Sequence, residues 1–192
     1  MHHGYKRWDE SDRRKTMDPD AILSKAGLKP GMTFVDIGCG QGYFALPAAR
    51  IVGPKGRVYG IDIDEEALGV LGRKAADLGL MIETIAGEGE NMVACEGCAD
   101  VVFFGICLHD FEDPEKVLAN ALRMLKPGGK LADIDWKKEP MEGGPPLEKR
   151  FSEEKALELI EGAGLAVESR EDVGGRYYLI TARLQRPAND NC

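Results

Sequence analysis

The chain has 192 residues, of which 43% are hydrophobic, and its formal net charge is −8. This length fits one domain with a substantial core. No apolar run approaches the roughly 20 residues that cross a bilayer, and residues 1–14 lack the apolar segment of a secretion signal. We therefore expect a cytoplasmic protein without a membrane span. The acidic balance and the lack of a Lys/Arg stripe argue against nucleic acid as the main partner.

The chain begins with a charged segment over residues 1–17, which we expect to be separate from the domain and able to act as a lid. A short helix is predicted over Ala21–Ala26, because Asp18 and Pro19 are typical cap and first-turn residues. The apolar run Met32–Ile37 predicts the first strand, and Tyr43–Val52 predicts the helix that follows it.

Between this strand and this helix stand three alternating glycines, Gly38, Gly40 and Gly42, preceded by Asp36. Glycine at every second position lets the backbone turn tightly and approach a bulky ligand, and the turn leads into a helix start whose N–H groups face that ligand. The segment therefore predicts a binding site for a nucleotide-like cofactor. A dinucleotide site would have a third glycine at position 43, where this chain has Tyr43.

The middle of the chain alternates between strand and helix patterns. Strands are predicted over Arg57–Ile61, Met81–Ala86, Ala99–Phe104 and Lys130–Ile134, and helices over Glu65–Leu78 and from Asp113 to about Leu125. Such alternation indicates an α/β fold with a doubly wound, mostly parallel sheet and helices on both faces. Ligands bind beyond the carboxyl ends of such strands, where Gly38–Gly42, Asp62, Glu88, Gly105–His109, Asp135 and Trp136 stand.

The last part of the chain has a different pattern. Pro140–Arg150 is a loop rich in glycine and proline, and a helix is predicted from Ser152 to near Gly162 or Gly164. Two further strands, Leu165–Arg170 and Tyr177–Leu184, are predicted to form an antiparallel hairpin. The domain is thus expected over 18–186, with a tail over 187–192.

The five cysteines are an odd number in a chain without an export signal, which argues against a disulfide framework. Cys95 and Cys98 have the spacing of half a zinc site, but no second such pair exists, so no metal is expected. Buried or idle thiols are the simpler interpretation.

Three motifs together make residues 18–184 resemble the class I S-adenosylmethionine-dependent methyltransferases. They are V-D-I-G-C-G-Q-G at the glycine loop, G-I-D-I-D over Gly60–Asp64, and L-K-P-G-G-K-L over Leu125–Leu131. C-L-H-D-F-E-D-P and D-W-K-K-E…G-P-P most resemble the small-molecule branch related to quinone-biosynthesis enzymes. The resemblance implies a Rossmann-like seven-stranded sheet with a C-terminal antiparallel hairpin, a small-molecule acceptor, and S-adenosylmethionine converted to S-adenosylhomocysteine. A homodimer is a further expectation, since a second subunit or the N-terminal lid would close the site.

The same resemblance implies roles for the residues at the strand ends. The glycines would wrap the methionine part of the cofactor, Asp36 would face its ammonium, and Asp62 would accept hydrogen bonds from both ribose hydroxyls. Ile63 would pack on adenine, Glu88 would receive the adenine amino group, and Gly89 would offer a backbone N–H. The expected cofactor-binding residues are Asp36, Gly38, Cys39, Gly40, Gly42, Asp62, Ile63, Glu88, Gly89 and Gly105. Asp62 could instead cap the next helix, and Glu88 could be a solvated loop acid.

His109 is the candidate catalytic base, because its Leu-His-Asp setting is similar to that of plant small-molecule O-methyltransferases, whose histidine deprotonates a hydroxyl. The alternative is a structural ring bonded to Asp110 or Asp113. Cys107, with Cys95 and Cys98, also loosely resembles the thiols of arsenite methyltransferases, which would make the acceptor a soft metalloid.

The acceptor pocket is expected to involve Tyr5, Trp8, Met17, Phe111 and the loop from Trp136 to Arg150. Two other classes stay open. A dehydrogenase of the NAD type is disfavoured by Tyr43 and the C-terminal hairpin. The other class is a non-catalytic cofactor-binding module, or a methyltransferase of protein or RNA. It is disfavoured because Gly105–Leu108 stands where enzymes that methylate amide or base nitrogens have an Asn-Pro-Pro-Tyr type signature.

Overall fold

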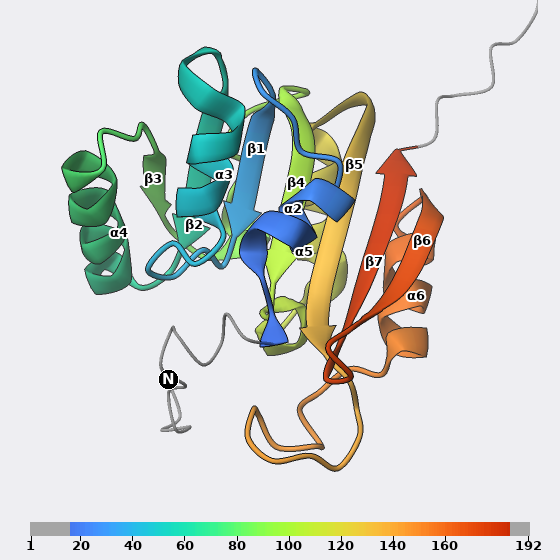
Figure 1. Cartoon of the computed structure of the whole chain (residues 1–192). Coiled ribbons are helices and arrows are strands. Elements are labelled where there is room, and N and C mark those ends of the chain that lie inside the picture. Colours follow the sequence, from blue (N-terminus) through green and yellow to red (C-terminus); the bar gives the residue numbers. More distant parts are fainter. Residues whose placement is uncertain (1–15, 185–192) are drawn as a thin grey trace, which may run out of the picture.

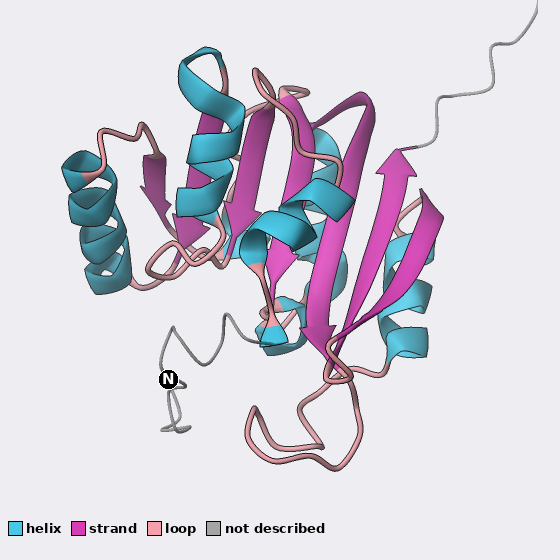
Figure 2. Cartoon of the chain, viewed as in Figure 1, coloured by secondary structure: helices cyan, strands magenta, loops and turns pink. Residues whose placement is uncertain are grey.

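The structure, a computed structural model, describes residues 16–184 of the chain. Most of the expected lid, including Tyr5 and Trp8, and the tail over 187–192 lie outside these residues. Figures 1 and 2 show one sheet between two layers of helices. This three-layer arrangement is the one that the alternation of strand and helix patterns predicts.

Seven strands form the sheet: β1 (Thr33–Ile37), β2 (Arg57–Asp62), β3 (Glu83–Ala86), β4 (Ala99–Gly105), β5 (Leu125–Trp136), β6 (Leu165–Val173) and β7 (Tyr177–Leu184). The α-helices are α2 (Pro19–Lys25), α3 (Ala45–Val52), α4 (Glu65–Asp77), α5 (Pro114–Met124) and α6 (Glu153–Gly162), with short 3-10 turns η1 (Gly53–Lys55), η2 (Gly89–Asn91) and η3 (Leu108–Asp110). The side chains of Asp18, Asp113 and Ser152 cap α2, α5 and α6, as their sequence positions indicate.

The strand order is β3-β2-β1-β4-β5-β7-β6. Neighbouring strands from β3 to β5 pair in parallel, whereas β7 runs antiparallel to both β5 and β6. In Figure 1 the arrowheads of β1, β4 and β5 reach the same edge of the sheet, and β7 points the other way. The expected Rossmann-like sheet with its C-terminal hairpin is confirmed. Its order reverses between β1 and β4, where ligands of open α/β sheets bind.

Two hydrophobic cores, one on each face, hold the layers together. Phe34, Phe103 and Leu71 belong to the core that α2, α3 and α4 cover, and Val102 and Leu118 belong to the core under α5 and α6. Figure 1 shows α2 and α3 in front of the sheet and α5 and α6 behind it. With both faces covered, the central strands are buried along nearly their whole length, which explains their continuous apolar runs.

Several element boundaries differ from the prediction by one to five residues, among them those of β5, α3 and β6. β5 begins at Leu125 instead of Lys130, because Pro127-Gly128-Gly129 forms an irregular extension of the strand and not a separate turn; the register with β4 shifts between Ala99 and Val101. α3 begins at Ala45 instead of Tyr43, whose hydroxyl donates to the carbonyl of Met17 at 2.6 Å. β6 continues to Val173, so the hairpin turn is shorter than expected.

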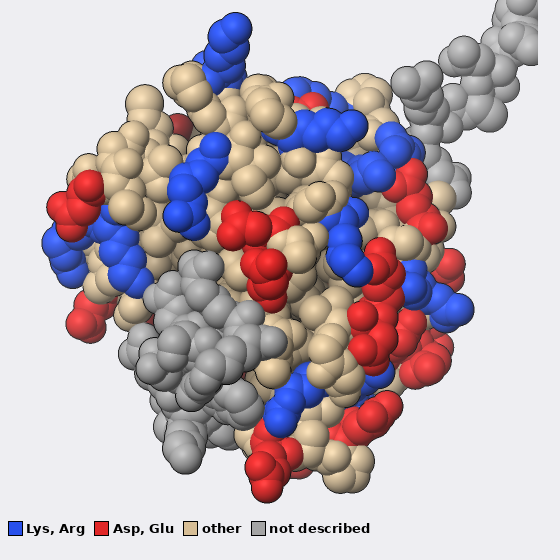
Figure 3. Space-filling model, in the orientation of Figure 1, with Lys and Arg blue, Asp and Glu red and all other residues tan. Residues whose placement is uncertain are grey.

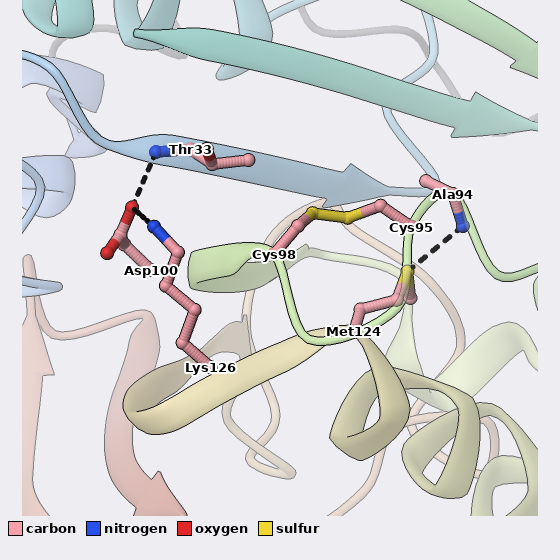
Figure 4. Close-up of a disulfide and its surroundings, with 7 residues drawn as sticks. All are labelled: Thr33, Ala94, Cys95, Cys98, Asp100, Met124 and Lys126. Carbon is pink, nitrogen blue, oxygen red and sulfur yellow. Dashed lines mark hydrogen bonds and ion pairs between the residues drawn. A yellow bond between two sulfur atoms is a disulfide. The ribbon is translucent and has the colours of Figure 1, made fainter.

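Cys95 and Cys98 form a disulfide, so the expectation of idle thiols at these two positions is wrong. The pair lies in the loop before β4, where the Ala94 N–H donates to Sδ of Met124 at 3.3 Å (Figure 4). The Asp100 carboxylate in the same view accepts from the Thr33 N–H and the Lys126 ammonium, both at 2.7 Å. A spacing of three residues places the two thiols on one short turn, where they can form a disulfide. The odd number of cysteines in the chain argues against a full disulfide framework but does not exclude one local bond of this kind.

Charged side chains of both signs intermingle over the face that Figure 3 shows. On the hairpin, Glu168 pairs with Lys130 at 2.7 Å and with Arg183 at 2.5 Å. Among residues 16–184, no helix has the length and apolar character that crossing a membrane requires.

Tyr178 provides a test of the packing behind β5. Its hydroxyl is buried without a hydrogen-bond partner in the described part of the chain. Burial raises the pKa of Tyr178, and the charges of Asp133 and Asp135 raise it further. Replacing Tyr178 by Phe is therefore expected to leave the free energy of unfolding unchanged or to raise it by about 1 kcal/mol. Tyr43→Phe, which removes the bond to the Met17 carbonyl, is the matched control and should lower it by about 1 kcal/mol. Urea titration measures both, and a loss for Tyr178→Phe as large as for Tyr43→Phe would contradict the prediction.

Candidate active site

The glycine loop leaves β1 at the edge where β4 also ends. Its conformation requires glycine, since Gly38 and Gly42 have φ of +73° and +89°. A Cβ on Gly38 would lie 2.8 Å from Sγ of Cys107, and a Cβ on Gly42 would lie 2.4 Å from the Leu71 side chain. Gly38 thus lets the loop pass the end of β4, and Gly42 lets it pack on α4. A Cβ on Gly40, by contrast, would meet nothing within 4 Å, so this glycine faces open space.

Asp62, at the end of β2, holds this loop in place. Its Oδ2 accepts from the Gly40 N–H at 2.7 Å, and its Oδ1 accepts from the Asp64 N–H at 2.9 Å. The helix cap is Asp64, which accepts from the Ala67 N–H, so the alternative in which Asp62 caps α4 is wrong. Each carboxylate oxygen of Asp62 still has a lone pair for another donor.

Asp36 lies beneath the loop and is 1% exposed. Neither oxygen of its carboxylate has a hydrogen-bond partner in the described structure. Burial raises the pKa of Asp36 well above its ordinary value, repulsion from Asp62 adds to the rise, and the nearby backbone N–H of Ala45 opposes it. A buried carboxyl without a partner is costly, and a cationic ligand group at this position would remove the cost.

The remaining candidates for cofactor contact divide into open and packed positions. Ile63 is 64% exposed, and Glu88 is exposed with its carboxylate accepting from the Asn91 side chain at 2.6 Å. Gly89 and Gly105 are tightly packed, because a Cβ would lie 2.8 Å from Phe111 and 2.6 Å from Phe44, respectively. The Cys39 side chain is also turned into the core, where burial raises its pKa, so only the backbone of these three residues can reach a ligand.

His109 follows β4 and is held by β5. Its Nδ1 lies 2.7 Å from Oδ2 of Asp135, and both side chains are 1% exposed. Burial lowers the pKa of His109, but the hydrogen bond and charge of Asp135 outweigh it and leave the pKa above 6.5. The hydrogen-bond partner of His109 is therefore Asp135, and not Asp110 or Asp113 as the structural alternative expects. Asp113 caps α5, and Asp110 comes only within 3.6 Å of Nε2.

The turn between β4 and His109 is strained. Ile106 has φ of +63°, a conformation that β-branched residues rarely adopt and that costs about 1–2 kcal/mol. Its N–H donates to the Ile134 carbonyl at 2.8 Å, and the Cys107 thiol donates to the Ile37 carbonyl at 3.0 Å. These bonds tie the turn to both neighbouring strands and so fix the approach to His109.

The thiols do not converge as a metalloid site would require. Cys95 and Cys98 precede β4 and Cys107 follows it, so the seven residues of β4 separate them by roughly 20 Å. Within residues 16–184, no group of three His, Cys, Asp or Glu side chains is placed to hold a metal ion.

Arg150 organises the loop that borders this edge, over residues 137–149. It is 4% exposed, and its guanidinium donates to four backbone carbonyls of the loop, those of Lys137, Glu139, Gly143 and Pro145. Burial lowers the pKa of Arg150, while the charge of Asp135 opposes the fall. Its guanidinium also covers the Trp136 ring at 5.3 Å, and Tyr177 packs on the same ring at 4.6 Å. Trp136 is thus buried within the loop's base, and Phe111 remains the partly exposed aromatic of the predicted pocket.

Replacing Arg150 by Met, which keeps the aliphatic stem, is expected to lower the free energy of unfolding by about 2–3 kcal/mol, because four carbonyls lose a charged donor. Arg123→Met is the control, since Arg123 pairs with Glu96 at an exposed position away from the loop, and this variant should lose less than about 1 kcal/mol. Urea titration and limited proteolysis of the loop measure the effect. Equal losses for the two variants would show that Arg150 does not hold the loop.

Three residues of this region were not identified from the sequence as functional. Asp135 was noted only for its position after a strand, Arg150 only as the end of a loop, and Ile106 gave no signal. Each depends on contacts between distant segments, such as the 26 residues that separate His109 from Asp135.

Comparison with known proteins places this geometry in context. A family model described as "Methyltransferase domain" matches residues 28–164. The ubiquinone/menaquinone biosynthesis C-methyltransferase UbiE of Vibrio parahaemolyticus is 32% identical over 66% of this chain and 48% of its own, and the nocamycin O-methyltransferase of Saccharothrix syringae is 36% identical over 57% and 40%. The crystal structure of a SAM-dependent methyltransferase from Aquifex aeolicus is 33% identical, with a TM-score of 0.86 over 93% of this chain and all of that one. The chain spans about half the length of the curated relatives that it matches first.

Proposed function

Because the chain belongs to the methyltransferase domain family, we propose that it transfers a methyl group from S-adenosylmethionine to a small-molecule acceptor. The single observation that carries the proposal is the arrangement around the glycine loop. Asp36 lies beneath the loop without a hydrogen-bond partner among residues 16–184, Gly40 faces open space, and Asp62 holds Gly40 from the next strand.

These residues fit the parts of the cofactor. The buried carboxylate of Asp36 suits an ammonium, which would satisfy the oxygens that lack partners. The free lone pairs of Asp62 suit the two ribose hydroxyls, and the exposed side chain of Ile63 suits the face of adenine. Glu88 is the weakest part of the set, since Asn91 already donates to its carboxylate.

When bound, S-adenosylmethionine supplies a methyl group on a sulfonium and becomes S-adenosylhomocysteine as the methyl–sulfur bond breaks and the acceptor–methyl bond forms. The residues of the chain align the acceptor, exclude water and remove a proton where the acceptor carries one. His109 is the base that we propose for this step: its Nε2 accepts the proton that the acceptor loses, and Asp135 stabilises the imidazolium.

The proposal of a small acceptor is supported by the names of the two sequence relatives, one a quinone-pathway C-methyltransferase and the other a nocamycin O-methyltransferase. One methylates carbon and the other oxygen, so the acceptor atom has to come from experiment. The partly exposed Phe111 and the loop held by Arg150 lie at the carboxyl edge of the sheet, as His109 does. They are the proposed contacts for the acceptor.

Two measurements test the function. Calorimetry should detect binding of S-adenosylmethionine and S-adenosylhomocysteine to the purified protein, and incubation with methyl-labelled cofactor and pooled metabolites should add one CH₂ mass to a metabolite. Absence of binding of both compounds would refute the proposal. Binding without transfer to any metabolite, followed by transfer to protein or RNA, would favour the macromolecular alternative, and binding of a nicotinamide cofactor would favour a dehydrogenase.

A further inference from the structure

Two buried acids on β5, Asp133 and Asp135, face the core beneath α5 and α6, and only one of them has partners. Asp135 is 1% exposed and uses both oxygens: Oδ1 accepts from the Trp136 N–H at 2.7 Å, and Oδ2 lies 2.7 Å from Nδ1 of His109. Asp133 is fully buried, and neither of its oxygens has a hydrogen-bond partner in the described structure.

We propose that Asp135 is a positioning residue that keeps the hydrogen of neutral His109 on Nδ1 and thereby leaves the lone pair of Nε2 free for the proton of the acceptor. This inference rests on the proposed function of the site. A carboxylate can only accept at Nδ1, so an ionised Asp135 requires the Nδ1–H tautomer. The backbone bond to Trp136 fixes the carboxylate, and the short contact to Nδ1 fixes the ring.

The other charged groups that face His109 act more weakly. Asp110 on η3 comes within 3.6 Å of Nε2, but its side chain is 63% exposed, so solvent screens it. Arg150 from the loop before α6 opposes protonation of the ring, while Asp110 and Asp135 favour it. Only Asp135 combines burial, a hydrogen-bond distance and a second anchor.

Asp133 differs from Asp135 in its surroundings, because no donor among residues 16–184 lies within hydrogen-bond distance of its carboxyl. Burial raises the pKa of Asp133 well above its ordinary value, and the neighbouring Asp135 raises it further. Within residues 16–184, Asp133 hydrogen-bonds to neither His109 nor the glycine loop, so it stays outside the site.

The two acids make a matched pair for experiment, because Asp133→Asn and Asp135→Asn are the same substitution on the same strand and face. The chain has only three histidines, so ¹⁵N NMR of labelled protein can follow the His109 ring, assigned with a His109→Gln variant. In the wild type we expect the neutral ring to carry its hydrogen on Nδ1 and to titrate above the ordinary histidine value. Asp135→Asn should lower that titration midpoint and mix the tautomers, whereas Asp133→Asn should change neither.

Turnover gives the second readout. In Asp135→Asn the acid limb of the pH–rate profile should move to lower pH and kcat should fall at least roughly tenfold, with cofactor affinity within about twofold. Asp133→Asn should match the wild type. A wild-type ring with its hydrogen on Nε2, or equal shifts in the two variants, would overturn the inference.

The NMR measurement needs neither acceptor nor turnover. Failure to bind the cofactor would therefore refute the proposed function while leaving the tautomer result intact, and a wrong tautomer in an active enzyme would refute this inference alone. If Asp135→Asn does not fold, the wild-type tautomer and midpoint still decide the question.

Discussion

Replacing Asp36 by asparagine is expected to stabilise the ligand-free protein and to weaken S-adenosylmethionine binding by roughly tenfold to a hundredfold. The carboxyl of Asp36 is buried, and no group in the described part of the chain hydrogen-bonds to it, so folding at neutral pH either neutralises it or buries its charge without a partner. Asparagine has the same shape but cannot ionise, so it removes the cost of neutralising or burying the charge, worth on the order of 2 kcal/mol, although its amide stays without a partner at this position. It also removes the charge that we propose for the ammonium of the cofactor.

The pH dependence of stability follows from the direction of the shift. Because the folded pKa of Asp36 is raised by burial and by Asp62, the native state binds a proton that the unfolded state releases above about pH 4. The free energy of unfolding therefore falls as pH rises from that value towards the folded pKa. Asp36→Asn should show a flatter profile than the wild type, with its gain largest at neutral pH.

Asp133→Asn is the matched control for Asp36, since Asp133 is equally buried and unpartnered but lies away from the glycine loop. We expect it to stabilise the protein in the same pH range and to leave cofactor affinity unchanged. Urea titration at several pH values and calorimetry with S-adenosylhomocysteine measure the two effects. Asp36→Asn with wild-type affinity would show that this acid serves the fold and not the cofactor.

Much of the fold could be predicted because its signals are local. Continuous apolar runs marked β1 and β4, the caps Asp18, Asp113 and Ser152 marked three helix starts, and the glycine loop marked the end of β1. Since carboxyl ends of parallel strands share one edge, the position of Asp62 next to this loop also followed from the strand assignments.

The rest depended on tertiary contacts that no local pattern carries. The start of β5 differs from the prediction because Pro127-Gly128-Gly129 has turn composition. In the fold a Cβ on Gly129 would lie only 2.9 Å from the Ala99 carbonyl oxygen, so glycine lets this part of β5 run close to β4. The partner of His109 lies on the adjacent strand, 26 residues along the chain, and not among its neighbours in sequence. Arg150 could not be identified as a clamp before the path of its loop was known, since its partners are backbone carbonyls, which every sequence contains.

Replacing His109 by alanine is expected to lower turnover by about a hundredfold or more and to leave the dissociation constant of S-adenosylmethionine nearly unchanged. The reason is that the ring accepts the acceptor's proton, while its partners are Asp135 and Asp110 and not the residues of the glycine loop. kcat with the acceptor found by the metabolite screen and the calorimetric dissociation constant measure the two quantities. Between pH 6 and 8, wild-type turnover should rise with pH, since only the neutral ring accepts a proton and its pKa is raised by Asp135.

His109→Gln separates chemistry from packing. Glutamine fills most of the buried space that alanine leaves empty, so it should restore stability but not turnover. Imidazole added to His109→Ala should recover part of the rate, because it can enter the space beside Asp135 and accept the proton, whereas His109→Gln has no such space. Losses of turnover and of cofactor affinity in equal proportion, or loss of neither, would instead make His109 a structural ring, and the base would have to be sought elsewhere at the carboxyl edge of the sheet.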